Sequence, residues 1–226
     1  MSNKILCIVA HPDDELLGCG GTLIKHIENN DKVDVLILGT GITSRLKTEY
    51  LDADMKIDKL RETSKEISKN LGYNVFFENF PDNKFDSISL LDIVQSIEKW
   101  INFINPNIIY THNHGDINID HRLTFEAVIT ASRPCFKGIR EIYSFETVSS
   151  TEWQAPQLQM FKPQLFSVIK DNILDKKMSA LRKYKTEMRE SPHPRNTTNI
   201  YNKAVVWGNV VLEDYCEVFE IIRIIK

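Results

Sequence analysis

The stretch His11-Pro12-Asp13-Asp14-Glu15 gathers one histidine and three carboxylates directly after an apolar, β-branched run at residues 5–9. His11 and Asp14 stand three residues apart, where a predicted buried strand passes into a helical pattern, so both can point at one spot above the strand end. Imidazole nitrogen and carboxylate oxygen are suitable zinc ligands. Asp13 lies between them and could take a proton from a water at the metal. The alternative is that the acidic residues only stabilise a helix N-terminus.

A second group of such side chains follows the predicted strand at 107–112, where the chain reads HNHGDINIDHR. Ligands of open α/β sheets bind outside the carboxyl ends of the strands, so two strand ends can supply one metal. We expect His121 to be the third ligand, with Asp120 holding or tuning His121 or the water at the site. Asp120 could also be the N-cap of the next helix, and His112 and His114 compete with His121 as ligands. Three protein ligands with one open position are typical of a catalytic zinc site.

The elements that must position both groups alternate between strand and helix. Strands are predicted at 4–10, 33–39, 74–80 and 107–112, and helices at 13–29, 55–71, 122–132 and from a cap at Asp86 or Ser87 to just before Pro106. This alternation predicts an α/β fold: a Rossmann-like, mostly parallel, doubly wound sheet with helices on both faces. Three glycines at 18, 20 and 21 predict an irregularity in the first helix. A polar loop at 42–54 is expected over the site.

The pattern becomes less regular from about residue 133. The expected elements there are strands at 141–147 and 166–169, helices at 171–188 and around 198–212, and a last strand at 215–225, placed at an edge of the sheet. Repeats, low-complexity stretches and clean linkers are absent from the sequence. We therefore expect one domain over residues 1–226, with the C-terminal third as its less regular part.

The composition narrows the class of protein. The net charge of the 226-residue chain is -3, with 42% hydrophobic and 26% charged residues, which offers no basic field for nucleic acid or an anionic lipid surface. No apolar run approaches the length of a membrane span, and we expect no signal peptide ahead of the first strand. The four cysteines form no CxxC pair, which is typical of reduced thiols. We expect a cytoplasmic protein without nucleic acid partners or membrane insertion; a homo-oligomer is compatible with the sequence.

With these residues in view, AHPDDELLGCGGTL and the downstream DINIDHR resemble the PIG-L/LmbE family of zinc-dependent deacetylases over roughly the first 130 residues. Members remove acetyl groups from N-acetylglucosamine-type sugars. The resemblance implies an LmbE-like fold, His11, Asp14 and His121 as zinc ligands, and Asp13 as general base. It also implies that Arg61, in the predicted helix at 55–71, contributes to substrate binding; the alternative for Arg61 is a solvated helix charge.

One departure from the family pattern affects the general acid. Many members read HPDH at the second motif, where this chain has Asn118-Ile119-Asp120-His121. Asn118 can donate a hydrogen bond but cannot protonate a leaving amine. Protonated Asp13 is one candidate for that task, and His193 is the other, although His193 could equally be an exposed loop histidine. The DINIDH form, together with SSTEW at 149–153 and SPHPR at 191–195, resembles a branch tied to surface-polysaccharide biosynthesis.

The expected reaction is hydrolysis of an N-acetyl group on an amino sugar or sugar conjugate. Zinc, or Fe²⁺ in its place, would activate a water and polarise the acetyl carbonyl. Asn118 or His114 would then stabilise the oxyanion. Trp153 is expected to stack on a sugar face, unless it is a core aromatic, and Arg61 or Arg195 to hold a hydroxyl, phosphate or carboxylate.

Three other functions are compatible with parts of the sequence. A metal hydrolase could act on a non-sugar amide, since the site chemistry is the same. A nucleotide-binding Rossmann protein is suggested by Gly18-x-Gly20-Gly21, but these glycines follow the start of the helical pattern, and GxGxxG is absent. A binding protein without catalysis would have no need of the set His11, Asp13, Asp14 and His121.

Overall fold

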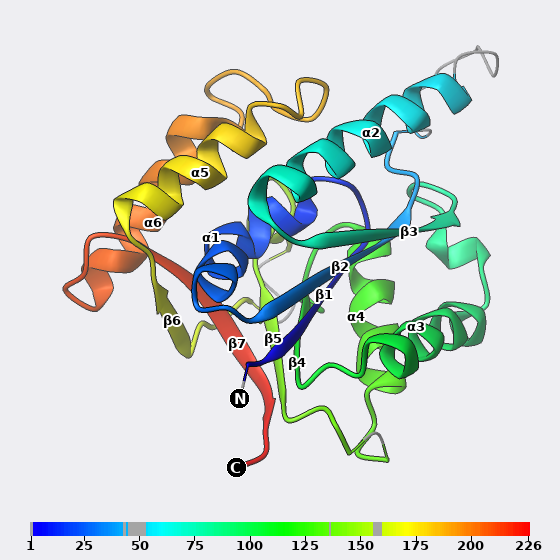
Figure 1. Cartoon of the computed structure of the whole chain (residues 1–226). Helices are drawn as coiled ribbons and strands as arrows, with labels where there is room; N and C mark the ends of the chain where they lie inside the picture. Colours follow the sequence, from blue (N-terminus) through cyan, green and yellow to red (C-terminus); the bar gives the residue numbers. More distant parts are fainter. Residues whose placement is uncertain (1, 43, 45–52, 136, 156–159) are drawn as a thin grey trace.

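Seven strands form one sheet in the order β3-β2-β1-β4-β5-β7-β6 (Figure 1). The computed structural model describes residues 2–42, 44, 53–135, 137–155 and 160–226. The strands are β1 (Lys4–Val9), β2 (Lys32–Gly39), β3 (Asn74–Phe80), β4 (Ile108–His112), β5 (Glu141–Phe145), β6 (Leu165–Val168) and β7 (Cys216–Ile224). The strands from β3 to β5 pair in parallel, and β7 is antiparallel to both of its neighbours. The sheet is therefore mostly parallel, as predicted.

Helices cover both faces of this sheet, which confirms the predicted doubly wound arrangement (Figure 1). They are α1 (Asp14–Glu28), α2 (Ala53–Leu71), α3 (Leu90–Ile104), α4 (Ile119–Ala131), α5 (Asp171–Leu181) and α6 (Thr197–Val210). One apolar cluster joins the sheet to α1, α2, α5 and α6, and a second joins the other face to α3 and α4. The β1 strand lies between the two layers with its side chains from Ile5 to Val9 fully buried. No helix of the described residues is long and apolar enough to cross a membrane.

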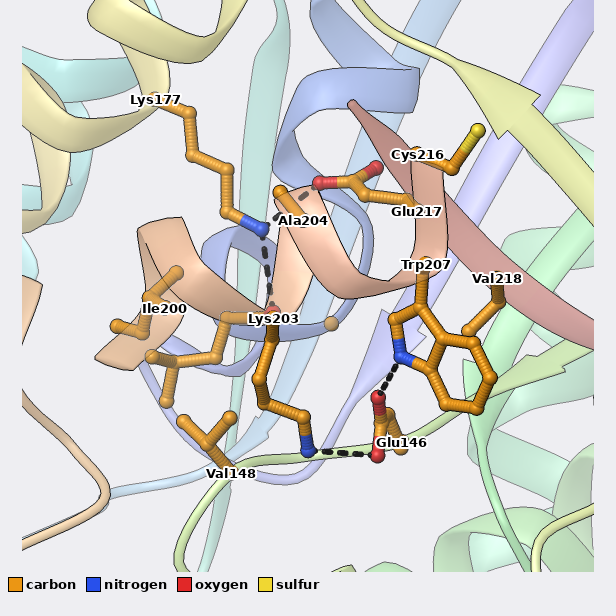
Figure 2. A pocket seen from close by; sticks show the side chains of 12 residues that line it. Glu146, Val148, Lys177, Ile200, Lys203, Ala204, Trp207, Cys216, Glu217 and Val218 are labelled. Atoms are coloured by element: carbon orange, nitrogen blue, oxygen red, sulfur yellow. Dashed lines mark hydrogen bonds and ion pairs between the residues drawn. The ribbon is translucent and has the colours of Figure 1, made fainter. Parts of the chain in front are cut away.

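The first helix is kinked at Cys19, where φ is -142° and ψ is 18°. A kink frees backbone groups that must find other partners. The Glu217 carboxylate of β7 accepts the N–H groups of Gly21 at 2.8 Å and Thr22 at 2.7 Å. Lys177 of α5 donates to Glu217 at 2.8 Å and to the carbonyl of Leu17 at 3.3 Å, beside a cavity of about 30 Å³ (Figure 2). The glycines predicted an irregularity in this helix. Its free backbone groups are bonded by two buried, charged side chains from the last third of the chain.

Several predicted boundaries differ from the structure. The last strand was expected at a sheet edge, but β7 lies between β5 and β6, and the described edges are β3 and β6. The α3 helix begins after Ser89, because a 3₁₀ turn occupies Phe85–Ser87. The α5 helix ends at Leu181 instead of continuing to 188, and turns follow it. Most of the loop expected at 42–54 lies outside the described residues.

Candidate metal centre

Three buried side chains from two strand ends meet above the carboxyl edge of the sheet. His11 follows β1, Asp14 opens α1, and His121 lies in the first turn of α4, just after β4. Asp14 Oδ2 lies 3.4 Å from His11 Nδ1 and 3.3 Å from His121 Nε2. One ligand atom from each of the three lies within 4.8 Å of the others. Two imidazoles and a carboxylate at this spacing fit a zinc or iron(II) ion with an open position.

The imidazole of His11 is oriented by Asp120. His11 Nε2 lies 2.9 Å from Asp120 Oδ2 and 3.3 Å from Asp82 Oδ1. The backbone N–H groups of Asn83 and Phe85 donate to the same Asp120 carboxylate, at 2.6 and 3.0 Å. A proton on Nε2 therefore leaves the Nδ1 lone pair facing Asp14, which is the arrangement of a metal-binding histidine.

The imidazole of His121 has a carboxylate of its own. His121 Nδ1 lies 3.1 Å from Asp116 Oδ2, and Asp116 also accepts hydrogen bonds from the hydroxyls of Ser150 and Thr151. Burial alone would raise the pKa of Asp116, but the charge of His121 and the hydrogen bonds from His121 and Ser150 lower it to about 2. Asp116 is therefore an anion that directs the other nitrogen of His121, Nε2, towards Asp14.

His112 competes poorly as a ligand, although it lies close by. Its Nε2 is 3.4 Å from Asp14 Oδ2 but accepts the backbone N–H of Ala10 at 3.0 Å, so its lone pair is already used. Its Nδ1 contacts the Thr147 hydroxyl at 3.2 Å. The ring stacks on His121 with centroids 3.9 Å apart, and burial together with the charge of His121 lowers the pKa of His112 to about 4. His112 is therefore neutral, and its ring packs flat against the ring of His121 and holds it in place.

A second group, formed by His11, Asp82 and Asp120, also has its ligand atoms within 4.8 Å. Its carboxylates already accept hydrogen bonds: Asp120 from the two backbone N–H groups above, and Asp82 from the N–H of Ser44 at 2.9 Å. It shares His11 with the first group but uses the ring nitrogen that faces Asp120. The first group is therefore the better candidate for a metal site, and the contacts of the second orient His11.

Asp13 lies beside the ligand group and is 1% exposed. Its backbone is left-handed, with φ 103°, and it is the N-cap of α1. Such a conformation is strained for a non-glycine residue and is retained where surrounding contacts enforce it. Here the Glu15 carboxylate accepts the Asp13 N–H at 3.1 Å. Burial raises the pKa of Asp13 well above its usual value, and the Arg195 guanidinium opposes that rise.

The C-terminal segment reaches Asp13 through Arg195. Nη1 of Arg195 lies 3.1 Å from Asp13 Oδ2, and its Nε donates to the Ser149 hydroxyl at 3.1 Å. The Arg195 backbone N–H donates to His193 Nδ1 at 3.1 Å. The His193 ring meets Trp153 edge-on, with centroids 5.5 Å apart, and Trp153 is 50% exposed. The SSTEW and SPHPR stretches therefore come together at the general-base candidate.

The structure gives other surroundings to the remaining predicted residues. Asn118, not Asp120, is the N-cap of α4, with its side-chain oxygen accepting the Asp120 N–H at 2.9 Å. Asp120 contacts His11, where the sequence suggested His121 or the site water. His114 packs on Phe125, with ring centroids 5.3 Å apart, at a separate open cavity.

Arg61 is likewise engaged away from the ligand group. Its Nη2 donates to the Glu78 carbonyl at 2.6 Å and to Asn79 Oδ1 at 2.8 Å. Its guanidinium also lies 5.2 Å from the centroid of the Phe77 ring. These contacts fasten α2 to β3, whereas the sequence offered substrate binding or a solvated helix charge for Arg61.

Sequence reasoning named Asp120 but missed the other carboxylates around the histidines. Asp82 follows the end of β3, so the strand-end rule that drew attention to the other two stretches could have found it. Asp116 was noticed only as one member of a polar stretch. The role of Glu15 depends on the backbone of Asp13 and on hydroxyls of Tyr73 and Tyr184, which contact Glu15 Oε1 at 3.3 and 3.2 Å. Nothing in the local sequence signals those partners.

Comparisons with known proteins agree with this fold. Solved structures with the same fold include N,N'-diacetylchitobiose deacetylase from Pyrococcus horikoshii, with a TM-score of 0.77 and 19% identity over 98% of this chain and 84% of that one. They also include GalB, the 4-carboxy-2-hydroxymuconate hydratase from Pseudomonas putida KT2440, with a TM-score of 0.76 and 21% identity over 100% and 99% of the two chains. At these identities the likeness establishes the fold alone.

Sequence comparisons reach further. The chain is 30% identical over 188 residues to the uncharacterized deacetylase YaiS of Escherichia coli (strain K12), covering 80% of this chain and 90% of that protein. The family model described as PIG-L, GlcNAc-PI de-N-acetylase, matches residues 6–132, more than half of the chain. The matched stretch contains both ligand-bearing strand ends, and the chain belongs to the PIG-L family.

Proposed function

We propose that this protein is a metal-dependent hydrolase that removes the N-acetyl group from an amino sugar or sugar conjugate. The observation that carries the proposal is the convergence of His11, Asp14 and His121 on one point, with the Asp13 carboxylate beside them. Membership of the PIG-L family supports the reaction, and the deacetylase names of its relatives support the class of substrate.

His11, Asp14 and His121 would hold the metal, because each histidine is oriented by its own carboxylate. A bound zinc or iron(II) ion would polarise the acetyl carbonyl and lower the pKa of the attacking water. The rest of the chemistry belongs to the chain's own side chains. His11 is the most exposed of the three ligands, at 8%, so we propose that substrate approaches from its side.

Asp13 is proposed as the general base. Its carboxylate takes a proton from water while the water oxygen bonds to the acetyl carbon. The C–N bond then breaks and the sugar nitrogen gains a proton, so that acetate and a free amine leave. Protonated Asp13 can return that proton. His193 is the second candidate, through Nε2, because its Nδ1 accepts the Arg195 N–H.

Arg195 and Trp153 are proposed to contact the sugar. Both belong to the segments that meet at Asp13, and the half-exposed indole offers a face for stacking. A role in polysaccharide or glycoconjugate biosynthesis would suit this substrate class.

Acetate release from a panel of N-acetyl sugars and N-acetyl amino acids would test the proposal. The zinc-loaded protein would be compared with Asp13→Asn and with Asp86→Asn, a matched change at an exposed position. We expect the Asp13 variant to keep its zinc and lose about 100- to 10,000-fold in kcat, while Asp86→Asn stays active. If acetate is released only from N-acetyl amino acids, the substrate is a non-sugar amide. If Asp13→Asn is as active as the unchanged protein, Asp13 is not the general base.

A further inference from the structure

A cavity of about 150 Å³ lies between α2 and the turns that follow α5. The two walls are joined by hydrogen bonds from Tyr184 to Ser64, at 2.9 Å, and from Lys183 to Glu66, at 2.6 Å. Figure 1 shows the end of α5 beside α2. The cavity is smaller than the roughly 300–1,000 Å³ of a site that encloses a whole small molecule. Its size suits one group of a larger ligand.

Lysines dominate the charge of this cavity. Lys56 and Lys59 line it from α2, and Lys183 and Lys185 line it from the opposite wall. The other lining residues carry no charge, and Glu66 is the carboxylate that pairs with Lys183. The hydrogen bond from Lys183 and the charge of Lys183, with a smaller contribution from the charge of Lys59, lower the pKa of Glu66, as expected in a positive field. In a chain of net charge -3, this is a local concentration of positive charge.

A short chain of buried residues links the cavity to the candidate metal centre. Gly41 separates the two: a Cβ there would lie 2.6 Å from Pro12 Cδ and 3.4 Å from Cδ2 of Leu60, which lines the cavity. Tyr184, another lining residue, contacts Glu15, whose carboxylate holds the Asp13 N–H. A substrate whose sugar lies at Asp13 would bring its next group to the lysines by extending around Pro12 and Gly41.

We propose that this lysine-lined cavity binds a phosphate or diphosphate ester carried by the N-acetyl sugar that is deacetylated at the metal centre. Lysine ammonium groups bind phosphate as compact point charges with freely turning donors. The inference rests on the proposed function, because the anionic group belongs to the same substrate. A nucleoside diphosphate sugar and a lipid diphosphate sugar share this chemistry.

Binding tests the site independently of catalysis. The probe is inorganic phosphate, titrated into the zinc-loaded protein by calorimetry. The cavity variant is Lys56→Gln/Lys59→Gln, and the control is Lys65→Gln/Lys69→Gln, which removes two charges from the same helix at exposed positions outside the cavity. We expect the cavity variant to bind phosphate at least fivefold more weakly than the control, with the difference shrinking at high salt. Phosphate that binds the metal affects both variants alike, so equal affinity in the two overturns the proposal.

Kinetics separates this proposal from the proposed function. The substrates are N-acetylglucosamine, its 1-phosphate, and its nucleoside diphosphate and short-chain lipid diphosphate forms. The cavity variant should raise KM for the phosphorylated forms at least fivefold with kcat unchanged, and leave the neutral sugar unaffected. The diphosphate form that is cleaved with the higher kcat/KM shows whether the natural substrate carries a nucleoside or a lipid. If the neutral sugar is cleaved and the cavity variant changes KM for none of the substrates, the proposed phosphate site is wrong and the deacetylase activity stands. If the cavity variant alone loses phosphate binding but no sugar is cleaved, the phosphate site stands and the proposed sugar deacetylase activity is wrong.

Discussion

Each histidine of the candidate metal centre is directed by a carboxylate on the ring nitrogen that faces away from Asp14. Asp120 directs His11, and Asp116 directs His121. Both carboxylates are buried and held in turn, Asp120 by backbone N–H groups and Asp116 by hydroxyls. The orientation of the two histidines therefore depends on these carboxylates, which can be substituted without changing a ligand residue.

The role of Asp116 can be tested by Asp116→Asn. The variant keeps the shape of the side chain but removes the charge that orients His121 and makes it a stronger ligand. We expect zinc affinity to fall about 10- to 100-fold, measured by competition with a chromogenic chelator. Asp86→Asn, at an exposed position, should leave it unchanged. Equal zinc affinity in a folded Asp116 variant would mean that His121 is oriented by its stacking on His112 alone.

A second prediction concerns how Arg195 holds Asp13. The guanidinium donates hydrogen bonds to Asp13 through Nη1 and to Ser149 through Nε, and Nη1 also lies 3.7 Å from Glu187 Oε2. Lysine keeps the charge but cannot make both contacts. Arg195→Lys should therefore lower kcat by about 10- to 100-fold, since a displacement of about 1 Å can cost that much, with zinc content unchanged. Arg189→Lys, a matched change on the same segment, should retain activity. Loss of zinc from Arg195→Lys would show that the residue supports the ligands instead of the base.

At the scale of elements, the kink of α1 is the feature that depends most on distant parts of the chain. Glu217 serves as a cap for the second half of the helix, and Lys177 serves the carbonyl of Leu17 in the first half. Both side chains are buried: that of Lys177 is 5% exposed and that of Glu217 is 6% exposed. A charge buried without its partner is costly, so the two residues should respond differently to substitution.

Glu217→Ala is expected to destabilise the protein more than Lys177→Met. Loss of Glu217 leaves two backbone N–H groups unpaired and the buried Lys177 ammonium without its counter-charge, at a cost of about 3–5 kcal/mol. Loss of Lys177 leaves Glu217 with both N–H donors, so its cost should be smaller. Urea unfolding of the two variants measures the order. The reverse order would mean that water replaces the carboxylate at the kink.

The same buried charges explain where sequence reasoning failed. The last strand was placed at a sheet edge, but Glu217 and Glu220 of β7 are each only 6% exposed. Glu217 is neutralised by Lys177, and Glu220 accepts from Asn113 at 2.8 Å and from the Lys162 N–H at 2.5 Å. All of these partners are at least 40 residues away in the sequence. A periodicity argument cannot anticipate them.

Other features of the fold and the site could be predicted because they depend on local patterns. β-Branched runs ending in polar residues located β1 and β4, and parallel strands bring such ends to one edge. This suffices to bring His11, Asp14 and His121 together. It does not reveal that Asp120 contacts His11, 109 residues away, since that pairing depends on the backbone N–H groups of the turn after β3.

At the scale of the whole molecule, the last third of the chain completes the first. One apolar cluster contains side chains of α1 together with those of β5, α5 and β7. The same third supplies Arg195 to Asp13 and Thr151 to Asp116. Stability and activity should therefore both respond to changes where α1 meets the late strands.

Gly18 is the position where that contact is closest. A Cβ on Gly18 would lie 2.1 Å from Cδ2 of Phe145 in β5, whereas a Cβ on Gly20 would come no closer than 3.2 Å, to Leu16 within the same helix. Gly18→Ala should therefore force α1 and β5 apart and cost about 1–3 kcal/mol. Gly20→Ala is the matched control and should cost less, since alanine also favours the helix by about 1 kcal/mol. In urea unfolding, the midpoint should fall for Gly18→Ala at an unchanged m-value. Gly18→Ala/Phe145→Leu should lose less than the two single changes added together, because the smaller side chain gives the methyl group room. Equal stability of the two glycine variants would mean that α1 can shift without disturbing β5.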